Sequence, residues 1–155
     1  MVEMPRVTLN SDLNEGYCFG CGRNNPIGLK LDFTPDGDGV RAEFTPDHAH
    51  QGWPGLLHGG ILGCLLDEAM SNAAYATGKT CLTASITIRL KQPVKVEVPL
   101  VVTGRVTRHR NRLIETAGEV RLKDGTVIAE STAKQFVAEN EAGKTDKVRE
   151  TRSHV

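Results

Sequence analysis

The sequence lacks the features that mark a membrane protein, a secreted protein or a nucleic-acid-binding protein. No apolar run approaches the roughly 20 residues that a membrane helix needs, and Met1 to Asn14 carry no signal-peptide pattern. The 19 Lys and Arg residues equal the 19 Asp and Glu residues in number, so no net charge attracts nucleic acid or an anionic membrane. We therefore expect no nucleic-acid or membrane partner. The chain has only four cysteines, and we expect them to be reduced thiols in a cytoplasmic protein.

The 155 residues match the usual size of one domain. We expect an N-terminal segment over residues 1–16 and a single domain over 17–138. Residues 139–155 contain mostly Glu, Lys, Asp, Arg, Thr and Ser. This composition predicts a solvated, disordered tail, because it offers little apolar surface to bury.

Two short strands are predicted ahead of a long helix. Residues 28–34 and 40–45 alternate apolar and polar side chains, and the turn residues 36–39 between them indicate a hairpin. Residues 46–57 have no period and are typical of an irregular loop. Residues 58–77 have the pattern of a helix that is apolar almost all round, which predicts that the helix is buried.

Four further strands are predicted, over residues 82–91, 98–109, 113–122 and 127–137. Alternation in the first of them places Thr83 on the face opposite Leu82 and Ile86. Asn111 and the pair Asp124-Gly125 mark the later turns. Two strands, a helix and four strands indicate the α+β class, with an antiparallel sheet of about six strands around one buried helix.

The start of the predicted helix combines two features that suggest chemistry. The first is the glycine pair after His58. Free N–H groups at a helix start favour an anion or a developing oxyanion, although a glycine pair more often marks a tight turn. The second is Asp67, a carboxylate within an apolar helix, which is costly to bury without a hydrogen-bond partner.

Helical spacing places Gly60, Gly63 and Asp67 on one face, with the carboxylate at the foot of a groove that the glycines leave open. Glu68 lies about 100° further round the helix. The alternative is that Asp67 and Glu68 simply emerge into solvent.

The segment from His58 to Asp67 resembles the active-site helix of hotdog-fold acyl-CoA thioesterases. Their motif is His-Gly-Gly followed by an acidic residue at the ninth position after the histidine. The resemblance is greatest to the phenylacetate-degradation and 4-hydroxybenzoyl-CoA thioesterase group. It covers about residues 17–137, including Gln51 to Gly55 and the strand from Thr83 towards Pro93. It implies a hotdog fold, acyl-CoA as substrate, and a homodimer or homotetramer with the site between subunits. We also expect no cofactor and no metal.

The resemblance also implies catalytic roles. Asp67 matches the catalytic carboxylate, which acts as general base or as nucleophile. Gly59 matches the residue whose backbone N–H contacts the thioester oxygen, and Gly60 supplies a neighbouring amide.

Three further residues have roles by resemblance. His58 is expected to shape the turn or to hydrogen-bond near the thioester. Thr83 is expected to place its hydroxyl near the catalytic water from the partner subunit. Gln51 lies one position before the amide residue of some relatives, so its equivalence to that residue is open.

Candidate substrate-binding residues flank this motif. Trp53 either lines the acyl pocket or pins its loop. Basic residues cluster later in the chain, and they form either a solvated strand face or a set of partners for the phosphates of CoA. The candidates for phosphate binding are Arg89, Arg108, Arg110 and Arg112.

The spacing Cys18-x-x-Cys21 is typical of a zinc knuckle or a redox pair. A structural zinc site usually has four protein ligands, and the chain has no second such pair, although His48 and His50 could complete a site. The sequence alone favours a glycine-supported turn in which the cysteines pack as small side chains.

A non-catalytic acyl-CoA-binding module of the same fold is the alternative function. Such a module does not need a competent carboxylate. The presence of Asp67 therefore favours the thioesterase.

Overall fold

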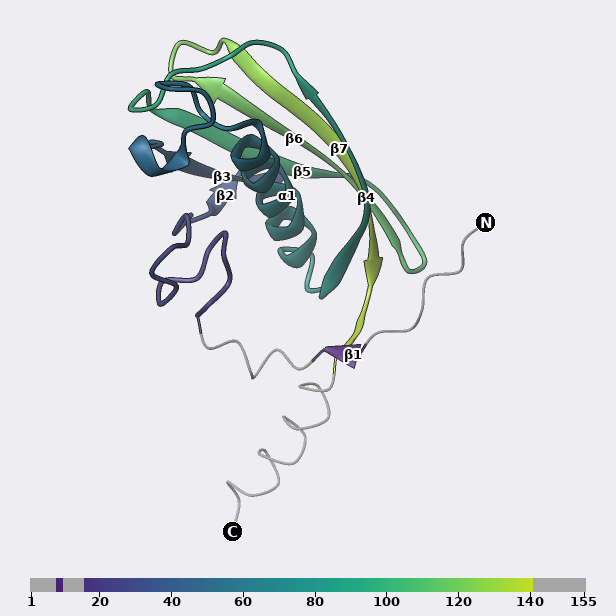
Figure 1. Ribbon diagram of the computed structural model, residues 1–155. Helices are drawn as coiled ribbons and strands as arrows, with labels where there is room; N and C mark the ends of the chain where they lie inside the picture. Colours follow the sequence, from purple (N-terminus) through teal and green to yellow (C-terminus); the bar gives the residue numbers. More distant parts are fainter. Residues whose placement is uncertain (1–7, 10–15, 141–155) are drawn as a thin grey trace.

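The computed structural model describes residues 8–9 and 16–140 of the chain. A six-stranded sheet curves around one long helix, which lies against its concave face (Figure 1). The sheet has the order β2-β3-β5-β6-β7-β4, and every neighbouring pair is antiparallel. The predicted α+β class, the antiparallel sheet and the single central helix are confirmed.

The bounds of the helix and of the five longer strands follow the predicted periodicity closely. The helix α1 spans Gly59–Tyr75. The strands of the main sheet are β2 (Thr34–Asp36), β3 (Gly39–Phe44), β4 (Cys81–Leu90), β5 (Leu100–Arg110), β6 (Leu113–Leu122) and β7 (Val127–Val137). A short 3-10 helix, η2 (His48–His50), interrupts the loop before α1.

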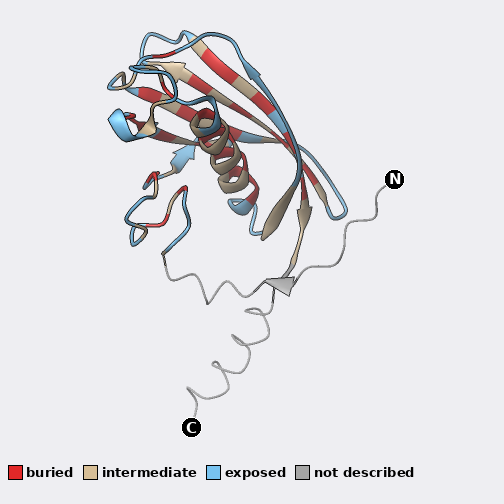
Figure 2. Cartoon of the chain, viewed as in Figure 1, coloured by how far each residue is buried: buried red, intermediate tan, exposed pale blue. Residues whose placement is uncertain are grey.

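One face of α1 is fully buried against the sheet. Leu65, Leu66 and Met70 have no exposed surface, and two strand glycines allow this close approach. A side chain at Gly104 would collide with the Ala69 carbonyl, and the β-carbon of one at Gly118 would lie 3.2 Å from the Met70 Cγ. The absence of side chains at these strand positions therefore sets how deeply α1 sits in the sheet. Figure 2 shows the buried residues of the strands on the side of the sheet that α1 covers.

The predicted strand over residues 28–34 is wrong for most of its length, since β2 begins only at Thr34. Lys30 has a φ of 53°, a left-handed conformation that cannot continue a strand. Leu29 and Leu31 are nevertheless buried. Their N–H groups donate to the carbonyls of Phe19 at 2.8 Å and Gly20 at 2.9 Å, so this segment packs on the loop before it.

The strand β4 contains a bulge that changes which side chains face α1. Its pairing with β7 matches Thr83 with Gln135 and Ser85 with Lys134, which leaves Ala84 as an extra residue. Simple alternation placed Thr83 on the face opposite Ile86. The extra residue reverses the parity, so Thr83 also points towards α1, and the expected face for Thr83 was wrong.

The ends of the described chain meet in a small second sheet. The strands β1 (Thr8–Leu9) and β8 (Glu139–Asn140) pair in parallel. Two residues of the predicted tail thus form a strand, and residues 141–155 lie outside the described residues. Within the described ranges, no helix combines the length and the apolar character needed to cross a membrane.

Candidate active site

The Asp67 carboxylate is held by a hydroxyl group from the bulged strand. The Thr83 Oγ1 donates a hydrogen bond to the Asp67 Oδ1 at 2.8 Å, and both residues are half-buried. Thr83 was expected to reach the site from a partner subunit, and that expectation stays a prediction. Within its own chain Thr83 lies beside Asp67, because the bulge turns it towards the helix.

The two neighbouring carboxylates of α1 face different surroundings. Asp67 faces β4 through Thr83, whereas Glu68 accepts a hydrogen bond from Asn72 at 3.2 Å and lies under the segment around Gly20. Side chains of β4 occupy the groove that was expected along the glycine face, however. A β-carbon added at Gly63 would lie 3.3 Å from the Ile88 Cδ1, and one added at Gly59 would lie 3.1 Å from the Leu90 Cδ1.

The start of α1 has one backbone donor available. His58 is the N-cap, and its Nδ1 accepts from the Gly60 N–H at 2.8 Å. That bond occupies the Gly60 amide, which was expected to contact substrate. Within the described part of the chain, the Gly59 N–H has no hydrogen-bond partner, and Gly59 is exposed. The helix dipole therefore acts at a single free donor.

The free donor and the carboxylate are too far apart to act on one thioester within one chain. Asp67 follows Gly59 by eight residues, which is about 12 Å along a helix axis at 1.5 Å per residue. A hydrogen bond spans only about 3 Å. One chain therefore carries two separated parts of a candidate site.

A hollow of about 610 Å³ lies at the helix start. It is lined by Gln51, Gly52, Trp53, Leu57, His58 and Gly59. The Gln51 Oε1 accepts from the Gly55 N–H at 3.0 Å, so this side chain supports the loop. Trp53 is 82% exposed, which leaves a large apolar surface at the rim of the hollow.

The four candidate arginines do not converge on either part of the site. Arg89 lies between Ile88 and Leu90, which face α1, so it points to the convex face and approaches the Glu130 carboxylate at 3.8 Å. The other three lie at the exposed end of the β5–β6 hairpin, where the Arg112 Nη2 donates to the Val137 carbonyl at 3.2 Å.

Gln135 was not among the expected site residues, yet it lies directly across from Thr83 in the sheet. Its side chain is completely buried, and neither amide atom has a hydrogen-bond partner among the described residues. Gln135 lies on the same face of β7 as Ser131, whose hydroxyl contacts the Met70 sulfur. Alternation along β7 was the signal that could have identified it, because it places the Gln135 amide on the same inward face as Ser131 and Ala133.

Comparison with known proteins identifies the fold. Residues 54–129 match the model of the Thioesterase superfamily. The chain is therefore similar to the thioesterase superfamily over about half of its length. The match includes α1, with Gly59 and Asp67, and the whole of β4, with Thr83.

Named relatives agree with this assignment. Acyl-coenzyme A thioesterase THEM4 of Bos taurus is 27% identical over 131 residues, or 83% of this chain and 54% of the relative. The crystal structure of protein RHA08564, a thioesterase superfamily protein, is 30% identical with a TM-score of 0.73. That alignment covers 79% of this chain and 60% of RHA08564.

A third match extends the likeness of fold. The E. coli PaaI protein, from the phenylacetic acid degradation operon, is 19% identical with a TM-score of 0.67, and the alignment covers 72% of this chain and 83% of PaaI. The chain spans about half the length of the bovine relative. The expected hotdog fold is confirmed.

Proposed function

We propose that this chain hydrolyses acyl-CoA thioesters to the free acid and CoA. The observation that carries the proposal is the Asp67 carboxylate, which the Thr83 hydroxyl holds at 2.8 Å on a helix within the region similar to the thioesterase superfamily. The name of the bovine relative, acyl-coenzyme A thioesterase, supports the substrate class.

The free N–H of Gly59 is the proposed electrophilic group. A thioester carbonyl placed against the start of α1 accepts a hydrogen bond from this donor. The negative charge on the oxygen grows as the tetrahedral intermediate forms, so the donor and the helix dipole stabilise the transition state more than the substrate. His58 supports this geometry by capping the helix through the Gly60 N–H.

Asp67 is the proposed catalytic carboxylate, and two routes are open to it. As a general base it removes a proton while the water oxygen attacks the acyl carbon, after which the carbon–sulfur bond breaks and the CoA thiolate leaves. As a nucleophile it attacks the carbon directly, and water then opens the mixed anhydride. In both routes the Thr83 hydroxyl fixes the orientation of the carboxylate.

The complete site is proposed to form between two copies of the chain. About 12 Å of helix separates Gly59 from Asp67 within one copy. The strand β4 is an edge strand, and it exposes Ile86, Ile88 and Leu90. Much of this strand is coloured as exposed in Figure 2. Pairing two copies through this face covers the apolar edge and brings the helix start of one copy to Asp67 of the other. A dimer is the minimal assembly, and a tetramer built from two dimers also satisfies the proposal.

The hollow at the helix start is the proposed place for part of the substrate. Trp53 on its rim offers apolar surface to an acyl group. Arg108, Arg110 and Arg112 are exposed at the β5–β6 hairpin and are proposed to reach the CoA phosphates. Arg89 is a weaker candidate, because it faces Glu130 on the convex surface. The cytoplasmic location expected from the sequence stays a prediction.

Measurement of thiol release from a panel of acyl-CoAs tests this function. We expect the purified protein to release free CoA from at least one short-chain, long-chain or aromatic acyl-CoA, faster than the Asp67→Asn variant does. A thiol-detecting reagent gives the rate. If no member of the panel is hydrolysed while acyl-CoA still binds in calorimetry, the chain is a binding module and the proposal fails.

A further inference from the structure

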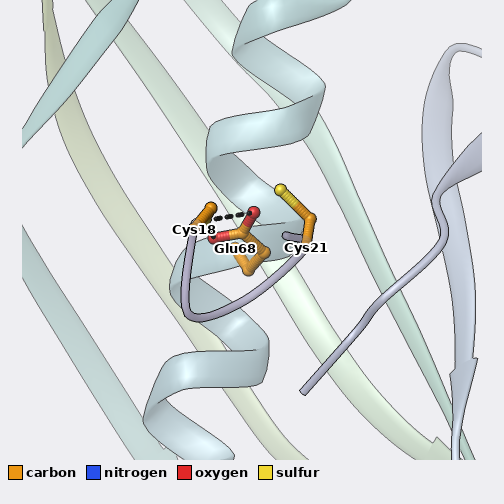
Figure 3. Close-up of side chains that lie close together, drawn as sticks. All are labelled: Cys18, Cys21 and Glu68. Atoms are coloured by element: carbon orange, nitrogen blue, oxygen red, sulfur yellow. Dashed lines mark hydrogen bonds between the residues drawn. The ribbon is translucent and has the colours of Figure 1, made fainter. Parts of the chain in front are cut away.

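The segment that packs across the outer side of α1 brings three metal-ligand side chains together (Figure 3). Cys18 and Cys21 come from a tight loop, and Glu68 comes from the helix beneath it. The Cys18 Sγ lies 3.7 Å and 3.8 Å from the two Glu68 carboxylate oxygens. One ligand atom from each of the three residues lies within 4.8 Å of the others. We call these three residues the Cys–Glu cluster.

The loop is built closely around this carboxylate. A side chain at Gly20 would collide with the Glu68 side chain, so glycine lets the loop pass close to the carboxylate in this position. The Gly22 N–H closes the turn by donating to the Cys18 carbonyl at 2.8 Å. On the other side, the Asn72 amide donates to the Glu68 Oε1 at 3.2 Å and fixes the orientation of the carboxylate.

The charge of the cluster is unbalanced by protein groups. Within the described part of the chain, no Lys, Arg or His forms an ion pair with Glu68. A thiol is only a weak hydrogen-bond donor to a carboxylate. A divalent cation would supply positive charge and convert the thiols into strong ligands.

We propose that Cys18, Cys21 and Glu68 bind one Zn²⁺ ion. Around tetrahedral zinc, with bonds of about 2.3 Å to sulfur and about 2.1 Å to oxygen, a sulfur and an oxygen ligand lie about 3.6 Å apart. The distances of 3.7 Å and 3.8 Å from the Cys18 Sγ to the Glu68 carboxylate oxygens are close to this sulfur–oxygen separation. Thiolate ligands select zinc over magnesium or calcium. A water molecule takes the fourth position, since Cys18 leaves the cluster exposed on one side.

This site differs from the zinc knuckle considered from the sequence. Glu68, 47 residues after Cys21, supplies the third ligand, and neither His48 nor His50 belongs to the cluster. The proposed ion joins the N-terminal loop to α1 at the residue next to Asp67. Zinc thereby stabilises the helix that carries the catalytic carboxylate, without taking part in thioester hydrolysis.

Metal content of the purified protein tests the site. We expect about one zinc per chain, measured by plasma mass spectrometry after dialysis against metal-free buffer. The double variant Cys18→Ser/Cys21→Ser should lose it, and Glu68→Gln should bind it more weakly. Cys81→Ser is the matched control, because Cys81 lies outside the cluster, and it should keep its zinc. Equal zinc content in the wild type and the double variant would overturn the proposal.

A second measurement uses only the wild-type chain, so it does not depend on a variant that folds. Metal-stripped protein is titrated with Co²⁺ alone and with Zn²⁺ alone. We expect thiolate-to-cobalt charge-transfer absorption that Zn²⁺ abolishes, with a zinc Kd of about 1 μM or tighter. Zinc should also protect two thiols from a thiol-modifying reagent. No absorption and no protection, or a Cys18–Cys21 disulfide in freshly reduced and stripped protein, would contradict a zinc site.

Discussion

Asp67→Asn is expected to lower acyl-CoA turnover by about 10²-fold or more, because asparagine keeps the size of the side chain but removes the base. Asparagine can still accept the hydrogen bond from the Thr83 hydroxyl, so the fold should be preserved. The rate is measured at saturating substrate, after circular dichroism and gel filtration confirm normal folding and assembly.

Glu68→Gln is the matched comparison, since the change is chemically the same at the next residue of the helix. It should cost less than about tenfold in turnover, because Glu68 faces the Cys18–Cys21 loop rather than β4. Its zinc content is measured on the same sample, so an effect through the metal is distinguished from one on the base. Full activity in Asp67→Asn together with loss of activity in Glu68→Gln would contradict the assignment of the two carboxylates.

Gly59→Pro is expected to lower turnover by about 10²-fold or more, the usual cost of removing an oxyanion donor. Proline has no N–H but is well tolerated at the first position of a helix. The preceding residue, His58, has φ −65° and ψ 132°, which a residue before proline readily adopts. The change therefore removes the proposed donor while the helix start is kept.

Gly59→Ala controls for the added side-chain atoms of proline. Alanine retains the N–H, and its methyl group would lie 3.1 Å from the Leu90 Cδ1, at the end of a flexible side chain. Its loss of turnover should be far smaller than that of Gly59→Pro. Equal losses in the two variants would show that crowding against Leu90, and not the missing donor, reduces the rate.

The fold could be predicted from the sequence because each element has its own hydrophobic period. Apolar residues spaced for a helix fill α1, and period-two alternation marks the four long strands. Turn chemistry was equally informative. Asn111 adopts a φ of 54° between β5 and β6, and Gly125 adopts 92° between β6 and β7. These signals are local, so a single sequence carries them.

Features that depend on contacts between distant residues could not be predicted. Nothing local in Gly28 to Thr34 shows that Lys30 takes a left-handed conformation, because the partners of this segment lie in the loop around Phe19. The bulge at Ala84 depends on the register with β7. Thr83 was therefore assigned to the wrong face, although its importance for the site was expected from family resemblance.

The candidate site was predicted in its residue types but not in its geometry. Asp67, Gly59 and His58 are where the motif placed them in α1. The motif does not show that the cap bond from His58 occupies the Gly60 amide. It also does not show that Glu68 meets Cys18 and Cys21, because helical spacing describes one element and the loop comes from another.

The central claim is that each active site uses Gly59 of one copy and Asp67 of the other. Two inactive variants, Gly59→Pro and Asp67→Asn, are co-expressed with different affinity tags, and the mixed dimer is purified through both tags. If each site takes Gly59 from one copy and Asp67 from the other, one site of the mixed dimer carries both changes and the other site carries neither. We expect about half of the wild-type turnover per dimer. A mixed dimer as inactive as its parents would contradict the claim, because it would place the donor and the carboxylate of each site in the same chain.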